Sequence, residues 1–312
     1  MTAVSPFEQF KKLNVQLVGL EDYMRHLLEL HNDDIIQEAG SYLHSGRFLH
    51  AAFFFLFSGF GDADSEDLRD NSLQSAAAAM QMFYIRNQMM RKHQAGPDSI
   101  KLNFMVEYFS DLIDVEFRKC SADDDDLQGK IDAVQEITTN QLMADEQMVK
   151  PVEDVAEYVK RIEASSAVMF EFACRFGAQA THADDVVVDS AGQIGRTIGL
   201  AYQIKSEILD LIGINTTEEQ FGPLYMLQSG EFTLATIFAV SKAGPDFMNK
   251  VAQAGRSGEK ELAETAEYII DNGVDAAQVM VKEYKDQAIF DINMLPNIPE
   301  KQDLKKLVNM LL

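Results

Sequence analysis

Apolar residues in this chain recur at spacings of three and four over long stretches, and this periodicity limits the folds that it can adopt. One such stripe consists of Val106, Phe109, Ile113 and Phe117. Strand-like alternation rich in Val, Ile and Thr is nearly missing, and only 7 of the 312 residues are proline. A repeat near 3.6 residues places apolar side chains on one helix face, which packs against other helices. The sequence therefore predicts an all-α protein.

Polar and Gly/Pro-containing clusters separate these stripes, and none of them is typical of a flexible interdomain linker. A phenylalanine-rich run at residues 51–57 predicts a helix that is buried on most sides and too short to span a bilayer. The acidic stretch at residues 121–126 is predicted to be a solvated loop. Residues 182–185 are predicted to be a turn that leads into a helix. We expect roughly ten or more helices in one domain covering residues 1–312.

The chain is strongly acidic, with 27 Lys+Arg against 50 Asp+Glu and a net charge of −23. Such a surface repels nucleic acid and anionic lipid, so neither a nucleic-acid partner nor stable membrane insertion is expected. Cys120 and Cys174 lack metal-ligand spacing and are predicted to be free thiols in a reducing compartment. The first residues lack a basic segment followed by an apolar run, so a cytoplasmic location is expected.

Residues 195–210 form the most distinctive segment, Gly-Arg-Thr-Ile-Gly-Leu-Ala-Tyr-Gln-Ile-Lys-Ser-Glu-Ile-Leu-Asp. This segment resembles the helix that carries the second aspartate-rich motif of trans-polyprenyl diphosphate synthases, where glycines, an aromatic residue and a glutamine lead into DDxxD. Further matches to that family follow in the same order at residues 171–178, 230–234 and 288–307. The resemblance implies an isoprenoid-synthase-like helical bundle around a central cavity, in a protein that forms dimers.

The resemblance also implies a chemistry with three requirements. Two aspartate clusters on facing helices hold Mg²⁺ on an allylic diphosphate, and the metal draws off negative charge as the diphosphate leaves. Basic residues bind the diphosphate of isopentenyl diphosphate. An apolar tunnel takes the growing prenyl chain.

The first aspartate cluster is lost. The positions that match it are Arg91, Lys92, His93, Gln94 and Ala95. Mg²⁺ cannot be held there, because like charge repels it and no anionic oxygen is present. One turn earlier, where the resemblance places the floor of the tunnel, the chain has Arg86, whose guanidinium is costly in an apolar tunnel unless it is paired.

The positions that match substrate-binding residues are also altered. The segment that would bind isopentenyl diphosphate aligns with residues 44–49, in which only Arg47 remains basic. The other departures from the family pattern are Gly46, Leu49, Gln141, Ala144, Ser165, Ser166 and Glu231. Arg47 and Gln203 are therefore the candidate substrate-binding residues.

Glu207 and Asp210 are what remains of the second cluster. Because they are three residues apart, both can face one side of a helix, with Gln203 one turn before them. One hypothesis is a single Mg²⁺ site, although two carboxylates need phosphate oxygens to complete it. The alternative, which we favour, is a solvated pair or a pair that contacts Lys205 or Arg196.

Three functions are consistent with this pattern. The first, which we favour, is a non-catalytic homologue in isoprenoid biosynthesis that acts as a regulatory subunit, as a homodimer or as a heterodimer with an active prenyl diphosphate synthase. The second is an active Mg²⁺-dependent prenyltransferase that makes geranylgeranyl or longer polyprenyl diphosphates with a reduced ligand set. The third is a binder of prenyl lipids or other apolar ligands, which the four methionines between residues 80 and 90 suggest.

Overall fold

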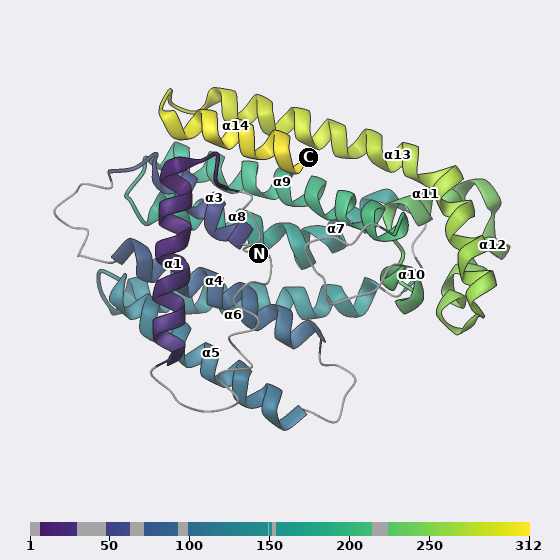
Figure 1. Ribbon diagram of the computed structural model, residues 1–312, viewed down its shortest axis with the longest axis horizontal. Coiled ribbons are helices and arrows are strands. Elements are labelled where there is room, and N and C mark those ends of the chain that lie inside the picture. Colours follow the sequence, from purple (N-terminus) through teal and green to yellow (C-terminus); the bar gives the residue numbers. More distant parts are fainter. Residues whose placement is uncertain are drawn as a thin grey trace. The chain divides into compact units, whose positions relative to one another are not determined.

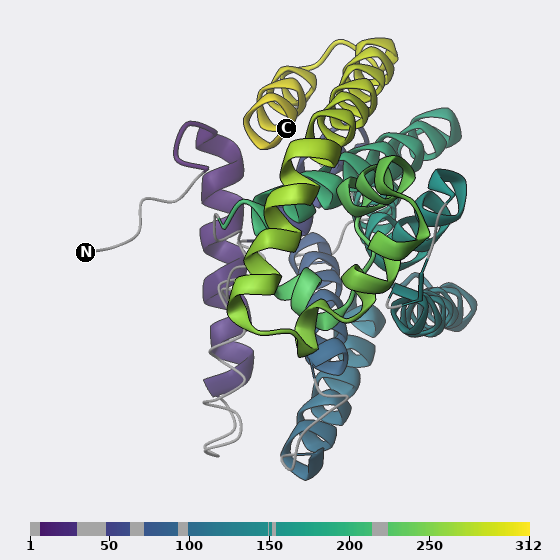
Figure 2. The same ribbon diagram turned by 90° about the vertical axis from the view of Figure 1, so that its right-hand side faces the viewer.

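The computed structural model describes residues 7–29, 48–62, 72–92, 99–148, 150–151, 154–213 and 224–312. These residues form helices joined by turns and contain no strand, so the all-α prediction is confirmed (Figure 1 and Figure 2). The chain divides into two compact units. Unit 1 comprises Met1–Thr138, Met169–Gly195 and Leu295–Leu304, and unit 2 comprises Thr139–Val168, Arg196–Met294 and Lys305–Leu312. A single domain over residues 1–312 stays a prediction.

Unit 1 is built around a fully buried helix. Its helices are α1 (Lys11–Glu29), α3 (Leu49–Ser58), α4 (Ser72–Lys92), α5 (Ser99–Lys119) and parts of α6 (Asp124–Met148), α8 (Val168–Gln179), α9 (Asp185–Leu211) and α14 (Pro299–Leu311). Every residue of α3 is buried, which confirms the prediction for residues 51–57. Gly177 of α8 permits close packing on α3, because a Cβ there would overlap the carbonyl oxygen of Phe54.

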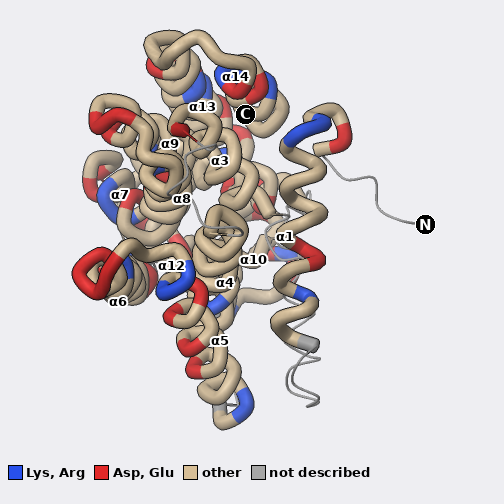
Figure 3. Tube along the Cα trace, turned by 90° about the vertical axis from the view of Figure 1, so that its left-hand side faces the viewer, with Lys and Arg blue, Asp and Glu red and all other residues tan. Residues whose placement is uncertain are grey.

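The start of α6 corrects one sequence-based prediction. Residues 121–126 are predicted to be a loop, but α6 begins at Asp124 and has three aspartates in its first turn (Figure 3). Oδ1 of Asp123 accepts the backbone N–H of Asp126 at 2.9 Å. Carboxylates satisfy free N–H groups at a helix N-terminus and interact favourably with the helix dipole. An acidic run that has the composition of a solvated linker therefore starts a helix.

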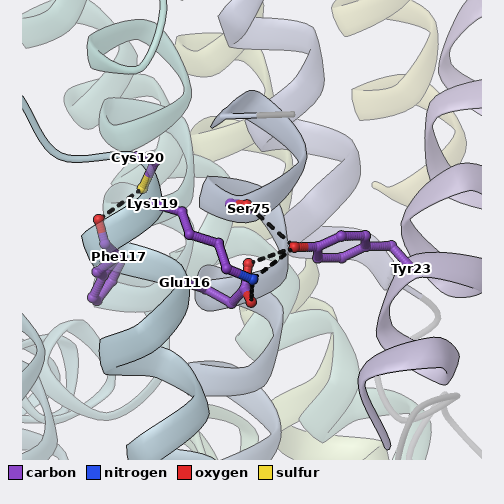
Figure 4. Close-up of polar contacts among 6 residues, drawn as sticks. All are labelled: Tyr23, Ser75, Glu116, Phe117, Lys119 and Cys120. Carbon is purple, nitrogen blue, oxygen red and sulfur yellow. Dashed lines mark hydrogen bonds and ion pairs between the residues drawn. The ribbon is translucent and has the colours of Figure 1, made fainter. Parts of the chain in front are cut away.

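A polar cluster of Tyr23, Ser75, Glu116 and Lys119 joins α1 to α4 and α5 (Figure 4). The Tyr23 hydroxyl donates to Oε2 of Glu116 at 2.8 Å, and it lies 3.3 Å from Oγ of Ser75. Nζ of Lys119 pairs with Oε1 of Glu116 at 2.5 Å. The Glu116 side chain is fully buried, so these two donors compensate a charge whose burial would otherwise be costly.

Unit 2 has its core between α9, α11 and α13. Its elements are the rest of α6, α9 and α14, together with α7 (Val155–Ile162), the π-helical turn η2 (Glu163–Ala167), α10 (Tyr225–Ser229), α11 (Leu234–Ala243), α12 (Pro245–Ala252), the 3₁₀ turn η3 (Ala254–Arg256) and α13 (Glu259–Met294). Gly273 lets α13 approach α11, because a Cβ there would overlap the carbonyl oxygen of Ala235. Ile204 and Ile208 of α9 pack in this core. Because α9 includes residues 195–210, the helix predicted there is confirmed.

Both cysteines are free, as predicted. Burial raises the pKa of the Cys120 thiol to about 11 and that of the Cys174 thiol well above its ordinary value, so both remain protonated. Within the described ranges, no helix is both long and apolar enough to cross a membrane. The cytoplasmic location stays a prediction.

Candidate functional site

The second half of α9 brings three candidate residues together. Gln203, Glu207 and Asp210 follow one another at spacings of four and three, which places them on one helix face. Nε2 of Gln203 donates to Oε1 of Glu207 at 3.1 Å. The remaining neighbours come from α7, α10 and α11, all within unit 2.

Glu207 is buried, with only 2% of its surface exposed. Its Oε2 accepts the hydroxyl of Tyr158 at 2.7 Å and the backbone N–H of Leu234 at 3.1 Å. Tyr158 lies on α7 and Leu234 is the first residue of α11, so one carboxyl group fastens two helices to α9. The prediction of a solvated pair is therefore wrong for Glu207. In the sequence, Val155, Tyr158, Val159 and Ile162 have the spacing of one apolar helix face. That spacing does not indicate the contact with Glu207, although a buried tyrosine hydroxyl needs a partner.

Burial raises the pKa of Glu207 from its ordinary value of 4.5 to about 7. The hydrogen bonds from Tyr158, Gln203 and Leu234 oppose this rise, and the nearby charge of Glu231 adds to it. Burial and the charge of Glu207 also raise the pKa of Tyr158 well above its ordinary value, so the phenol is the donor. Near neutral pH, the Glu207 carboxyl is therefore only partly ionised.

Asp210 holds the start of α10. Its Oδ1 accepts the backbone N–H of Tyr225 at 3.3 Å, and its Oδ2 accepts that of Met226 at 3.2 Å. These N–H groups belong to the first turn of a helix and have no partner within it. The preceding residue, Leu224, has a φ of 64°, and its N–H donates to the carbonyl oxygen of Asp210. A left-handed conformation is unusual for leucine, and these three bonds stabilise it. Burial raises the pKa of Asp210, and the two backbone bonds to its carboxylate lower it.

This arrangement does not fit Mg²⁺. Each oxygen of Glu207 and of Asp210 already accepts at least one hydrogen bond from the protein, so a cation would have to share these oxygens with N–H and O–H donors. Mg²⁺ also requires near-octahedral oxygen ligands. Lys205, a predicted partner of the pair, instead donates to the carbonyl oxygen of Leu311 at 2.7 Å. No group of three His, Cys, Asp or Glu side chains in the described part of the chain is placed to hold a metal.

Two of the five positions that match the first cluster lie at the end of α4. Arg91 and Lys92 are the last residues of that helix. The structure does not describe their side chains, and it does not describe Arg47 or His93 at all. The roles assigned to these four residues from the sequence stay predictions.

Arg86, one turn earlier on α4, is 9% exposed. Its Nη2 donates to Oγ1 of Thr138 at 2.5 Å and to Oδ1 of Asn87 at 3.1 Å, and its Nη1 lies 3.4 Å from Oγ of Ser110. Burial lowers the pKa of Arg86 to about 10, and the charge of Asp114 partly opposes this. The guanidinium is thus hydrogen-bonded, as its burial requires, and its acceptors are neutral.

Comparison with known proteins identifies the family. The family model described as "Polyprenyl synthetase" matches residues 112–271, which is just over half of the chain. The chain belongs to the polyprenyl synthetase family. The match includes residues 195–210 and therefore all three site residues of α9.

Several relatives in this family are similar over part of their length. Geranylfarnesyl diphosphate synthase of Aeropyrum pernix is 30% identical over 162 residues, which cover 51% of this chain and 49% of that protein. Heptaprenyl diphosphate synthase component 2 of Geobacillus stearothermophilus is 30% identical over 145 residues, covering 45% and 43%. The chain thus spans about half the length of the curated relatives that it matches.

A solved structure extends the similarity of fold to nearly the whole chain. Geranylgeranyl pyrophosphate synthase from Lactobacillus brevis ATCC 367 superposes with a TM-score of 0.86 at 26% identity, covering 99% of this chain and 98% of that one. The isoprenoid-synthase-like helical fold is therefore confirmed.

Proposed function

We propose that this polyprenyl synthetase homologue has no prenyltransferase activity alone and is a regulatory subunit of an active prenyl diphosphate synthase. One observation carries the proposal: the hydrogen bonds on Glu207 and Asp210 give these carboxylates a structural role. In the synthases that the chain resembles, the equivalent cluster holds Mg²⁺. Here Glu207 accepts hydrogen bonds from α7 and α11 and so joins both helices to α9. Asp210 accepts two backbone N–H groups at the start of α10 and joins that helix to α9.

The composition of the first cluster supports the same conclusion. Its positions carry Arg91, Lys92 and His93 in place of carboxylates, and cations repel Mg²⁺. Because the family's chemistry uses two facing clusters, a chain that lacks metal ligands in both has no means of drawing charge from a leaving diphosphate.

The heteromeric role is supported by the name of one relative. The Geobacillus stearothermophilus protein is called component 2 of heptaprenyl diphosphate synthase, which describes one part of an assembly. Other relatives are named simply as synthases, so an active enzyme is the alternative that an assay must exclude.

The test is an elongation assay on the purified protein with Mg²⁺, an allylic diphosphate and isopentenyl diphosphate. We expect no elongation by the protein alone, and a change in product length when it is mixed with an active homologue from the same genome. The matched control is Glu207→Gln, which keeps the shape of the buried side chain and should behave like the wild type in both assays. Elongation by the wild type alone would sink the proposal, and loss of that elongation in Glu207→Gln would assign the activity to this carboxylate. Unchanged products on mixing would argue against the regulatory role.

A further inference from the structure

Two buried polar side chains of unit 1 have atoms without a hydrogen-bond partner within the described ranges. These atoms are Nδ1 of His50 on α3, and both Nε2 and Oε1 of Gln81 on α4. His50 is 6% exposed and Gln81 is 0% exposed. Most buried polar atoms in proteins have a partner, and one without a partner costs free energy. Three such atoms on neighbouring helices therefore indicate a bound molecule.

Both side chains lie near the ring of Tyr84. The His50 ring contacts the Tyr84 ring at a centroid distance of 4.4 Å, and it contacts the Phe170 ring of α8 at 4.5 Å. Gln81 is three residues before Tyr84, so both project from the same side of α4. Because α3 packs on α4, the His50 and Gln81 side chains approach the same region between these two helices.

The surroundings favour a neutral ligand. Helix α3 contains no Asp, Glu, Lys or Arg, and α4 contains none between Ser72 and Ile85. Burial lowers the pKa of His50 from 6.5 to about 3, and no neighbouring charge contributes to this shift, so the imidazole is neutral near pH 7. A charged ligand at these atoms would be buried without a counter-charge, which is costly.

The donors and acceptors select a hydroxyl group. Nδ1 of a neutral imidazole either donates a proton or accepts one, and a carboxamide has one acceptor oxygen and two N–H donors. A hydroxyl group both donates and accepts, so it suits either tautomer of His50 and either end of the Gln81 amide. Ala77 and Ala78 are fully buried one turn before Gln81, on the same side of α4. An apolar chain attached to the hydroxyl would find apolar side chains there.

We propose that His50 and Gln81 bind the hydroxyl group of a small neutral molecule, with Nδ1 of His50 and the Gln81 amide as its hydrogen-bond partners. The molecule is a short aliphatic alcohol or water, which present the same hydroxyl chemistry. This site is independent of the proposed function, because it requires neither a metal nor a diphosphate and includes no residue of the α9 site.

The test is solution NMR of the whole protein, with isotope labels on the histidine rings and the glutamine side-chain amides. Titration with n-butanol to about 50 mM should produce saturable shifts at His50 and Gln81, with a Kd below about 10 mM. Gln81→Met, observed at His50, and His50→Phe, observed at Gln81, should each raise this Kd at least about tenfold. The matched control is Gln128→Met, on an exposed position of α6, and it should leave the Kd within about twofold.

A rotating-frame Overhauser measurement without n-butanol distinguishes the two sources of the hydroxyl group. Saturable shifts that weaken in both variants would identify an alcohol site. A contact between water and the Gln81 amide protons, with no saturable shift on titration, would assign the site to water.

The absence of both signals would overturn the inference, as would n-butanol binding that Gln81→Met and His50→Phe leave unchanged. Circular dichroism shows whether each variant folds. If one does not, the titration and the water measurement on the wild type still decide, because they need no substitution. The outcome of the elongation assay changes none of these signals, so failure of the proposed function is distinguishable from failure of this inference.

Discussion

The buried carboxyl group of Glu207 allows a pH-dependent test of the site. Glu207→Gln keeps an oxygen that can accept the Tyr158 hydroxyl and the Leu234 N–H, and it removes the charge. Above neutral pH the wild type holds an ionised carboxylate in its core, and the variant does not. We therefore expect Glu207→Gln to become more stable relative to the wild type as the pH rises.

The magnitude follows from the raised pKa. A rise from 4.5 to about 7 corresponds to roughly 3 kcal/mol at about 1.36 kcal/mol per pH unit. Because the pKa is higher in the folded state, the folded protein binds the proton more tightly than the unfolded chain. The associated stability is fully present below about pH 4.5 and is lost as the pH rises through about 7. Between about pH 5.5 and about pH 8, the stability of the variant relative to the wild type should increase by about 2 kcal/mol.

The assay is urea denaturation of both proteins at the two pH values, followed by circular dichroism. The ionisable groups that the two proteins share cancel in the difference between their free energies of unfolding. Glu267→Gln, on an exposed position of α13, is the matched control and should shift the free energy of unfolding by less than about 0.5 kcal/mol at both pH values. Glu207→Ala leaves the Tyr158 hydroxyl and the Leu234 N–H buried without an acceptor, so it should cost about 2–4 kcal/mol throughout.

A constant difference between Glu207→Gln and the wild type across this pH range would refute the reasoning. It would mean that the carboxyl is solvated or held by a cation, so that its charge carries no burial cost. The structural account of the second cluster would then fail, whatever the elongation assay showed.

Three further outcomes follow from the same contacts. Addition of about 5 mM Mg²⁺ should leave the Tm measured by calorimetry unchanged within about 1 °C. A specific site with a Kd about a hundredfold below that concentration would instead stabilise the folded protein by about 2.7 kcal/mol. Glu116→Ala removes the buried acceptor of the polar cluster at α1. It should lower the free energy of unfolding, measured by denaturant titration, by about 2–3 kcal/mol. The matched control Glu136→Ala changes an exposed residue and should lower the free energy of unfolding by less than about 0.5 kcal/mol. Gly177→Ala should cost more than about 2 kcal/mol in the same assay, because its Cβ would meet the α3 backbone, whereas Gly129→Ala has open space in α6 and should gain about 0.5–1 kcal/mol.

The helices could be predicted from the sequence because periodicity is local information. Phe109, Ile113 and Phe117 are spaced to share one face, and all three are buried in α5. Residues 121–126 show the limit of composition, since aspartates are equally suited to a solvated loop and to the first turn of a helix. The hydrogen bonds that Asp123 and Asp126 accept distinguish the two.

The spacing of Glu207 and Asp210 predicted their shared face but not their partners. Tyr158 and Leu234 lie 49 and 27 positions from Glu207 in sequence, and no local pattern specifies contacts at such separations. The same holds for Arg86, whose acceptor Thr138 is 52 positions away.

The donors around Asp210 explain why a carboxylate there does not require catalysis. The backbone N–H groups of Tyr225 and Met226 each need an acceptor, and a carboxylate offers one oxygen to each. Asparagine would present an NH₂ group to one of these donors and leave an N–H of the first turn of α10 unpaired. The acidic residue therefore follows from the geometry of α10 and the left-handed Leu224 that precedes it. At Asp210 both oxygens accept backbone N–H groups, which gives this carboxylate a structural role that needs no metal.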